Sequence, residues 1–448
     1  MIDKHTALAR CQDLVALAQR MGADAADAVA RANASESVSM RLGKLEEVER
    51  SESEEIGLRV FVGKRSASIN TSDFAEDGLR ALAERAVQMA RHAPEDKHSG
   101  LAPEEALFAG ELPELELDDP DQPDPESLRE AALATEEAAR AVAGVTNSNG
   151  GSASASRAVV ALATSNGFAR GYAGSGFSLS ASMIAGEGGA MQTDYASRNA
   201  RFRSDLPSPE EVGSEAGRRA VARLNPVSIP SSKLPVVFEP RIGGGLVGHL
   251  LGAMSGPAAA RKASFLLGLE KDELFDPAIR IVEDPLRQRG PRSRPFDGEG
   301  VACTSRALVE NGRIFGWLTN VSSADQLGLA LTGHASRSGG GSPGVSASNV
   351  HMERGSVSPE TLMADIEDGL YVTSLFGQGV NTVTGDYSRG ATGFRIRGGE
   401  IAEPVAEITI AGNLKDMFRA LTPADDLEMY RSINVPTLRI DGMTVAGE

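Results

Sequence analysis

Residues Gly243 to Gly248, GGGLVG, match the G-x-G-x-x-G pattern of loops that hold the phosphates of dinucleotides. An apolar run, LPVVFEP, precedes the glycines, and a run that could form a helix follows them, as a dinucleotide-binding unit requires. However, Pro240 and Arg241 interrupt the passage from strand to turn, and Pro257 interrupts the helix. The neighbouring sequence also predicts antiparallel hairpins. A nucleotide-dependent enzyme therefore remains only an alternative.

The same stretch has a second regularity, a glycine at every fourth position: Gly244, Gly248, Gly252 and Gly256. On a helix this spacing forms one stripe, along which another backbone can approach closely. Each of these glycines costs a helix about 1 kcal/mol relative to alanine. We therefore expect the stripe to pack tightly against a sheet or a partner.

Other residues of catalytic type are isolated. His249 lies in the predicted helix, but a zinc site needs three protein ligands and no further ligand lies at suitable spacing. GGSPG, residues 340–344, matches the G-x-S-x-G pattern of serine hydrolases around Ser342, yet no strand precedes it and the run is typical of a flexible loop. His334 and His351 flank this loop and are interpreted as structural. No complete catalytic or metal-binding set emerges.

Composition excludes several classes of function. The 448 residues carry a formal net charge of −17, which opposes the phosphates of nucleic acids, so no nucleic-acid partner is expected. Two cysteines, Cys11 and Cys303, are too few for a disulfide framework and suit a cytoplasmic protein. The N-terminus predicts an amphipathic helix, not a signal peptide. The longest apolar stretch, residues 243–260, contains a His and a Pro, and no membrane span is expected.

The length predicts two domains of the α+β class. In residues 1–228, the segments ADAVARA, SVSMRLGK, LEEVERSES and IGLRVFVGKRSASINTS alternate polar and apolar residues, which predicts an antiparallel sheet. Helices predicted at 73–94, 125–143 and 208–225 would cover it. Residues 101–127 hold ten carboxylates, five prolines and no Lys or Arg, which predicts an exposed acidic connection.

Residues 229–448 predict a β-rich mixed domain with few helices. Short strands and turn signals follow one another in RALVENGRIFGWLTN, GFRIRGGEIAEPVAEITIAG and PTLRIDGMTV. Helical patterns occur only at roughly 245–263, 358–369 and 413–420.

Read in order, these C-terminal segments resemble one family. RPFDGEGVACTSRALVENGRIFGWLTN, NTVTGDYSRGATGFRIRGGEIAEPVAEITIAGNL and PTLRIDGMTVAG are similar to segments of the TldD/PmbA family, also called modulators of DNA gyrase. GLRVFVGKRSASINTSD extends the resemblance into the N-terminal domain. The family name also suggests a gyrase regulator that acts through protein contacts.

The resemblance implies a specific role, because the family has two paralogous subunits. In the TldD type, a helix with H-E-x-x-x-H supplies two zinc ligands and a general base, and a later Cys supplies the third ligand. Here the first His position is Gly244, the Glu position is Gly245 and the last His position is His249. The final hundred residues contain no Cys. The chain therefore resembles the PmbA (TldE) subunit, and residues 229–448 resemble a degenerate metalloprotease domain without metal or cofactor.

The resemblance also implies partners. The two subunits form a heterodimer that encloses a cavity, in which the TldD-type paralogue cuts small unfolded peptides; an isolated chain could form a homodimer. LFGQGVNTVTG resembles the strand that pairs with substrate, which makes Gly377, Gly379, Val380 and Asn381 candidate peptide-binding residues. An ordinary edge strand with a glycine bulge is the alternative. A stand-alone homodimeric peptidase also remains open.

Overall fold

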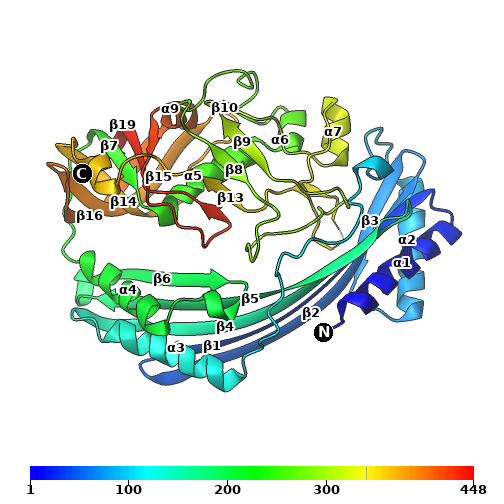
Figure 1. The fold of residues 1–448 in the computed structure, drawn as a ribbon, viewed down its shortest axis with the longest axis horizontal. Coiled ribbons are helices and arrows are strands. Elements are labelled where there is room, and N and C mark those ends of the chain that lie inside the picture. The colour runs from blue at the N-terminus through cyan, green and yellow to red at the C-terminus, as the bar shows by residue number, and fades with distance from the viewer. Residues whose placement is uncertain (340, 448) are drawn as a thin grey trace.

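The structure, a computed structural model, describes residues 1–339 and 341–447. Its N-terminal half contains a six-stranded antiparallel sheet with the order β3-β2-β1-β4-β5-β6. The strands are β1 (Ala25–Arg41), β2 (Lys44–Val62), β3 (Arg65–Thr71), β4 (Val145–Thr164), β5 (Ala169–Ala185) and β6 (Gln192–Ala200). Strands of up to 20 residues accumulate a large twist, and the sheet bends into a trough. The C-terminal half lies on its concave side (Figure 1).

Helices cover the convex side of the sheet (Figure 1). They are α1 (Lys4–Arg20), α2 (Glu76–His92), α3 (Pro125–Arg140) and α4 (Pro209–Ala222). Buried alanines such as Ala83, Ala86 and Ala90 of α2 let a helix lie close to the strands. The predicted helix 208–225 begins with a capping box, in which Ser208 and Glu211 each accept a hydrogen bond from the other's backbone N–H. The predicted α+β class is confirmed.

The acidic segment 101–127 differs from the exposed connection that its charge predicted. It contains a short 3-10 turn, η1 (Glu104–Ala106), and then runs between the two halves of the molecule. Leu115 and Leu117 are buried, and the Leu117 carbonyl accepts a hydrogen bond from Ser175 N–H. Glu116 pairs with Arg289 at 3.1 Å. Apolar residues interleaved with the carboxylates hold the segment down, while most of its charged side chains remain exposed.

The C-terminal half contains two main sheets. One has the order β16-β15-β14-β7-β19-β17, and an extra pairing of β16 with β19 closes five strands into a barrel. Its strands are β7 (Ser232–Phe238), β14 (Asp368–Phe376), β15 (Asp386–Arg397), β16 (Glu400–Asn413), β17 (Leu421–Pro423) and β19 (Leu438–Ala446). The second sheet comprises β10 (Arg313–Ile314), β9 (Arg306–Glu310), β8 (Ile281–Glu283), β13 (Val350–Met352) and β18 (Ile433–Asn434). A small ribbon pairs β11 (Ala335–Ser336) with β12 (Gly344–Val345).

The C-terminal helices correct two predictions. They are α5 (Pro240–Ala253), α6 (Gly256–Ala260), α7 (Val321–Leu327), α8 (Pro359–Met363) and α9 (Leu414–Arg419). The predicted helix 245–263 is two helices, and Pro240 starts the first because proline suits the first helical position. Helix α7 was not predicted. None of the helices in the described residues has both the length and the apolar character needed to cross a bilayer.

An aromatic cluster joins the two halves. Phe296, from the C-terminal half, packs edge-on against Phe168 and Tyr172, with ring centroids 5.0 and 5.5 Å apart. Phe168 and Phe296 are buried together with Val29 and Leu162 of the sheet. This shared core holds the C-terminal half against the concave face of the sheet. It therefore fixes the relative positions of the residues that line any site between the two halves.

Candidate functional site

The glycine run lies inside helix α5. The helix begins at Pro240, and the N–H of Gly243 donates to the Glu239 carbonyl at 2.9 Å. The backbone amides that follow are engaged in the helix's own hydrogen bonds, so they cannot cradle a phosphate. The GGGLVG run is therefore not a phosphate-binding loop, and it does not support the nucleotide-dependent alternative.

Helix α5 forms one wall of a groove of about 530 Å³ between the two halves. This wall is formed by the glycines Gly244, Gly245 and Gly248. The other lining residues include Ser197 and Asn199 of β6 and the segment 430–433. A Cβ atom on Gly245 would meet no other atom within 4 Å. The groove thus runs beside bare helix backbone.

The glycine stripe packs less tightly than predicted. A Cβ atom on Gly256 would lie 2.8 Å from the Leu318 carbonyl oxygen, which is the close approach expected. On Gly248 it would meet only the Ile433 side chain at 3.9 Å, and on Gly252 nothing within 4 Å. Within this chain, the middle of the stripe is an open surface.

His249 lies half-buried on the same helix, edge-on to the buried Tyr387, with ring centroids 6.1 Å apart. Burial, with Arg389 nearby, holds the pKa of His249 below its usual value. Both cysteines are buried, and burial raises the pKa of each thiol to about 12, which opposes the thiolate form that a metal needs. In residues 1–339 and 341–447, no three His, Cys, Asp or Glu side chains are placed to hold a metal ion.

Comparison with known proteins identifies the family. Three domain profiles of the PmbA/TldA metallopeptidases match this chain: domain 1 at residues 26–90, the central domain at 118–224 and the C-terminal domain at 231–447. The chain belongs to the PmbA/TldD family. It is 38% identical to "Metalloprotease PmbA" of Escherichia coli O157:H7, over 92% of this chain and 90% of that protein. A Haemophilus influenzae "Metalloprotease PmbA homolog" is 37% identical over 97% of this chain and 94% of that protein.

Solved structures of family members share the fold. A Bacteroides thetaiotaomicron protein, described as a candidate modulator of DNA gyrase, superposes with a TM-score of 0.91 at 25% identity over all of both chains. TldE of Thermococcus kodakarensis superposes with a TM-score of 0.85 at 20% identity, over 98% of this chain and all of that one. The second likeness concerns the fold alone.

The predicted peptide-binding residues Gly377, Gly379, Val380 and Asn381 lie in the connection between β14 and β15. Val380 forms a bridge with Tyr387, the residue that also contacts His249. A Cβ atom on Gly379 would lie 1.9 Å from the Ser388 carbonyl oxygen, so packing within the chain already requires this glycine. A bulky residue at Gly379 would disturb the chain's own packing. A loss of peptide binding in such a variant would therefore not show that this segment pairs with a substrate strand.

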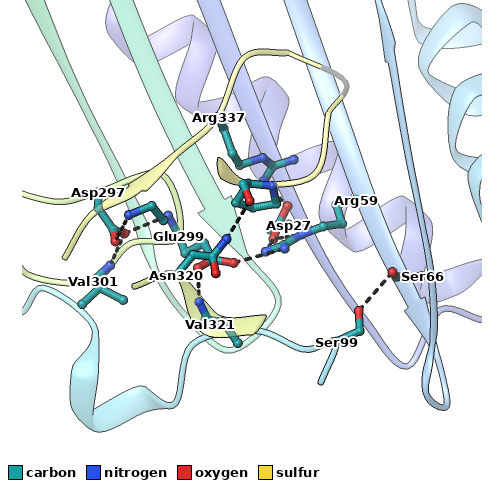
Figure 2. Close-up of polar contacts among 12 residues, drawn as sticks. Asp27, Arg59, Ser66, Ser99, Asp297, Glu299, Val301, Asn320, Val321 and Arg337 are labelled. Carbon is teal, nitrogen blue, oxygen red and sulfur yellow. Dashed lines mark hydrogen bonds and ion pairs between the residues drawn. The ribbon is translucent and has the colours of Figure 1, made fainter. Parts of the chain in front are cut away.

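A buried network of charges joins the sheet to the C-terminal half. Asp27 of β1 accepts hydrogen bonds from Nε and Nη2 of Arg59 in β2, at 2.8 and 2.5 Å, and from Nη1 of Arg337. Figure 2 shows both guanidinium groups turned toward Asp27. Arg59 also donates to Glu299 at 3.1 Å, and the second Glu299 oxygen accepts from Val321 N–H at 2.8 Å. Burial alone would raise the pKa of Asp27, but the two arginines hold it below its usual value.

Asp297 supports the loop that carries Glu299. One of its oxygens accepts from the N–H groups of Glu299 and Val301, both at 2.9 Å (Figure 2). The other oxygen accepts from Ala335 N–H at 2.8 Å. Burial, and to a lesser degree the charge of Glu299, raises the pKa of Asp297 to about 7. The loop therefore depends on a carboxyl group that titrates near neutrality.

Sequence reasoning brought together Gly244, Gly245 and His249, but it missed the charges around the groove. Arg201 and Arg431 line adjoining hollows although 230 positions separate them in the chain. No local spacing could have paired them. In the sequence, Arg201 stands in NARFRS and Arg431 in MYRSIN, and no acidic residue adjoins either arginine.

Proposed function

We propose that this chain is the non-catalytic, PmbA (TldE)-type subunit of a zinc metalloprotease complex that cleaves small unfolded peptides. The observation that carries the proposal is the chemistry of helix α5. Gly244 and Gly245 stand where the TldD-type motif has a His ligand and the general-base Glu, and His249 alone keeps its imidazole. One imidazole cannot hold a catalytic zinc, which needs three protein ligands.

We infer that the working partner is a TldD-type paralogue in a cytoplasmic heterodimer, and that residues 229–448 form the degenerate protease domain. Related proteins carry the name metalloprotease, which supports a role in peptide hydrolysis. The open face of α5 at Gly245 and Gly252 supports contact with something outside this chain. The stand-alone peptidase is the alternative that the test below addresses.

The purified chain, loaded with zinc and then dialysed, should retain far less than one equivalent of metal. The reason is that a lone, half-buried imidazole binds zinc weakly, whereas a TldD-type paralogue treated in parallel should retain one equivalent. A His249→Ala variant should hold as little metal as the unmodified chain. Stoichiometric zinc that is lost in the His249→Ala variant would contradict the proposal.

A further inference from the structure

The groove beside α5 continues into a second hollow. The smaller hollow, about 270 Å³, lies over the sheet and is lined by Ser154, Ser156, Ser178 and other small residues of β4 and β5. Asn199 and Pro291 line both spaces, so the two adjoin. Together they form a channel between the concave face of the sheet and helix α5.

Two arginines line this channel without a carboxylate partner. Arg431 donates through Nη1 only to the Arg241 carbonyl at 2.9 Å, and its Nε is buried with no hydrogen-bond partner in the described residues. Arg201 donates to the carbonyls of Gly290, Ser175 and Pro291 at 3.3, 3.0 and 2.8 Å. Within the described part of the chain, neither guanidinium forms an ion pair.

Neighbouring arginines, unlike Arg201 and Arg431, form ion pairs with carboxylates. Arg241, in the same groove, pairs with Asp194 at 2.8 Å and with Glu239 at 3.4 Å. Arg198 pairs with Glu215 at 2.8 Å. In a chain of net charge −17, two partly buried cations that form no ion pair within the described residues favour an anionic ligand in the channel. Burial also lowers the pKa of Arg201, although the nearby Tyr172 and Asp118 offset part of this effect.

We propose that this channel binds peptides through a carboxylate, which the unpaired guanidinium of Arg431 receives beside the bare backbone at Gly245. A guanidinium presents two parallel N–H donors that match a carboxylate, and such charge-assisted bonds strengthen in a partly buried site. Arg201 provides a second positive charge further along the channel, so acidic or product-like peptides are the preferred class. This inference rests on the proposed role in peptide processing.

The test measures binding to this chain alone, with a zinc chelator present so that no hydrolysis intervenes. Three fluorescein-labelled, unstructured peptides are compared by anisotropy: one with a free C-terminus and no acidic side chain, its C-terminal amide, and the amide with one internal Glu. The free acid or the Glu peptide should bind roughly tenfold or more tightly than the plain amide. Which of the two binds tightly tells whether the carboxylate is terminal or from a side chain.

Two pairs of variants test the placement. Arg431→Gln should abolish the preference for the carboxylate, whereas Arg313→Gln, at an exposed pair with Glu273, should preserve it. Gly245→Leu should fill the groove and weaken binding roughly tenfold or more. Gly252→Leu, two turns further along the same helix with equally open surroundings, should leave it unchanged. Circular dichroism confirms that each variant is folded.

Equal affinity for all three peptides would overturn the inference, as would a carboxylate preference that survives in Arg431→Gln. Equal effects of Gly245→Leu and Gly252→Leu would overturn the placement in the groove. Because binding is measured without a protease, this outcome is independent of whether the chain proves to be catalytic.

Discussion

Replacing Asp27 by alanine should lower the free energy of unfolding by about 3–5 kcal/mol, because it leaves the buried Arg337 without a counter-charge and Arg59 with Glu299 alone. Arg337 has a fully buried side chain, and the side chain of Arg59 is 9% exposed. In the Asp27→Ala variant, Arg337 would lose its only ion-pair partner among the described residues. Urea unfolding followed by circular dichroism measures the loss.

An exposed ion pair provides the control for Asp27. Glu273 and Arg313 approach to 3.2 Å at the surface, with side chains 60% and 54% exposed. Glu273→Ala should therefore cost less than about 1 kcal/mol. Adding Arg337→Met to Asp27→Ala should recover part of the loss, because it removes one stranded charge. Equal effects of Asp27→Ala and Glu273→Ala would show that the network does not stabilise the contact between the halves.

Replacing Asp297 by asparagine should change how stability depends on pH. In the folded chain the pKa of Asp297 is raised to about 7 by burial and by Glu299, from an ordinary value of 3.8. Between these values the folded state holds a proton that the unfolded state has released. The stability contributed by Asp297 is thus fully present below about pH 4 and is lost as the pH rises through 7, by up to about 4 kcal/mol.

Unfolding free energies at pH 5, 6, 7 and 8 test this sign. The difference between the unmodified chain and Asp297→Asn should shift steadily against the unmodified chain as the pH rises, and should level off above pH 7. Other groups titrate in both proteins and cancel in the difference. A difference that is constant with pH, or that shifts in the opposite direction, would contradict the assigned pKa.

In the N-terminal half, local patterns predicted the types of the elements correctly but not the lengths of the strands. The predicted antiparallel sheet is present, with hairpin turns at the Gly-Lys pairs 43–44 and 63–64, and the predicted helix 208–225 is α4. The four short segments, however, belong to three strands, two of them of 17 and 19 residues. β1 pairs along its length with β2 on one side and with residues 151–164 of β4 on the other, and local alternation cannot predict this second, distant pairing.

At the candidate site, the family motif located the helix but not its surroundings. The positions of Gly244, Gly245 and His249 follow from sequence alone, and the structure adds that Gly245 faces an open groove. Pro240 misled the prediction, because the same residue that breaks a helix in its interior starts one at its first position. The unpaired Arg201 and Arg431 depend on long-range packing and were beyond any local pattern.

We propose that this chain is the metal-free half of a peptidase. The most direct measurement is cleavage of an unstructured peptide by this chain, by the TldD-type paralogue from the same source and by their mixture, each with and without a zinc chelator. We expect activity that is confined to the mixture and abolished by the chelator. Chelator-sensitive cleavage by this chain alone would contradict it, and would place a metal site away from Gly244 and Gly245.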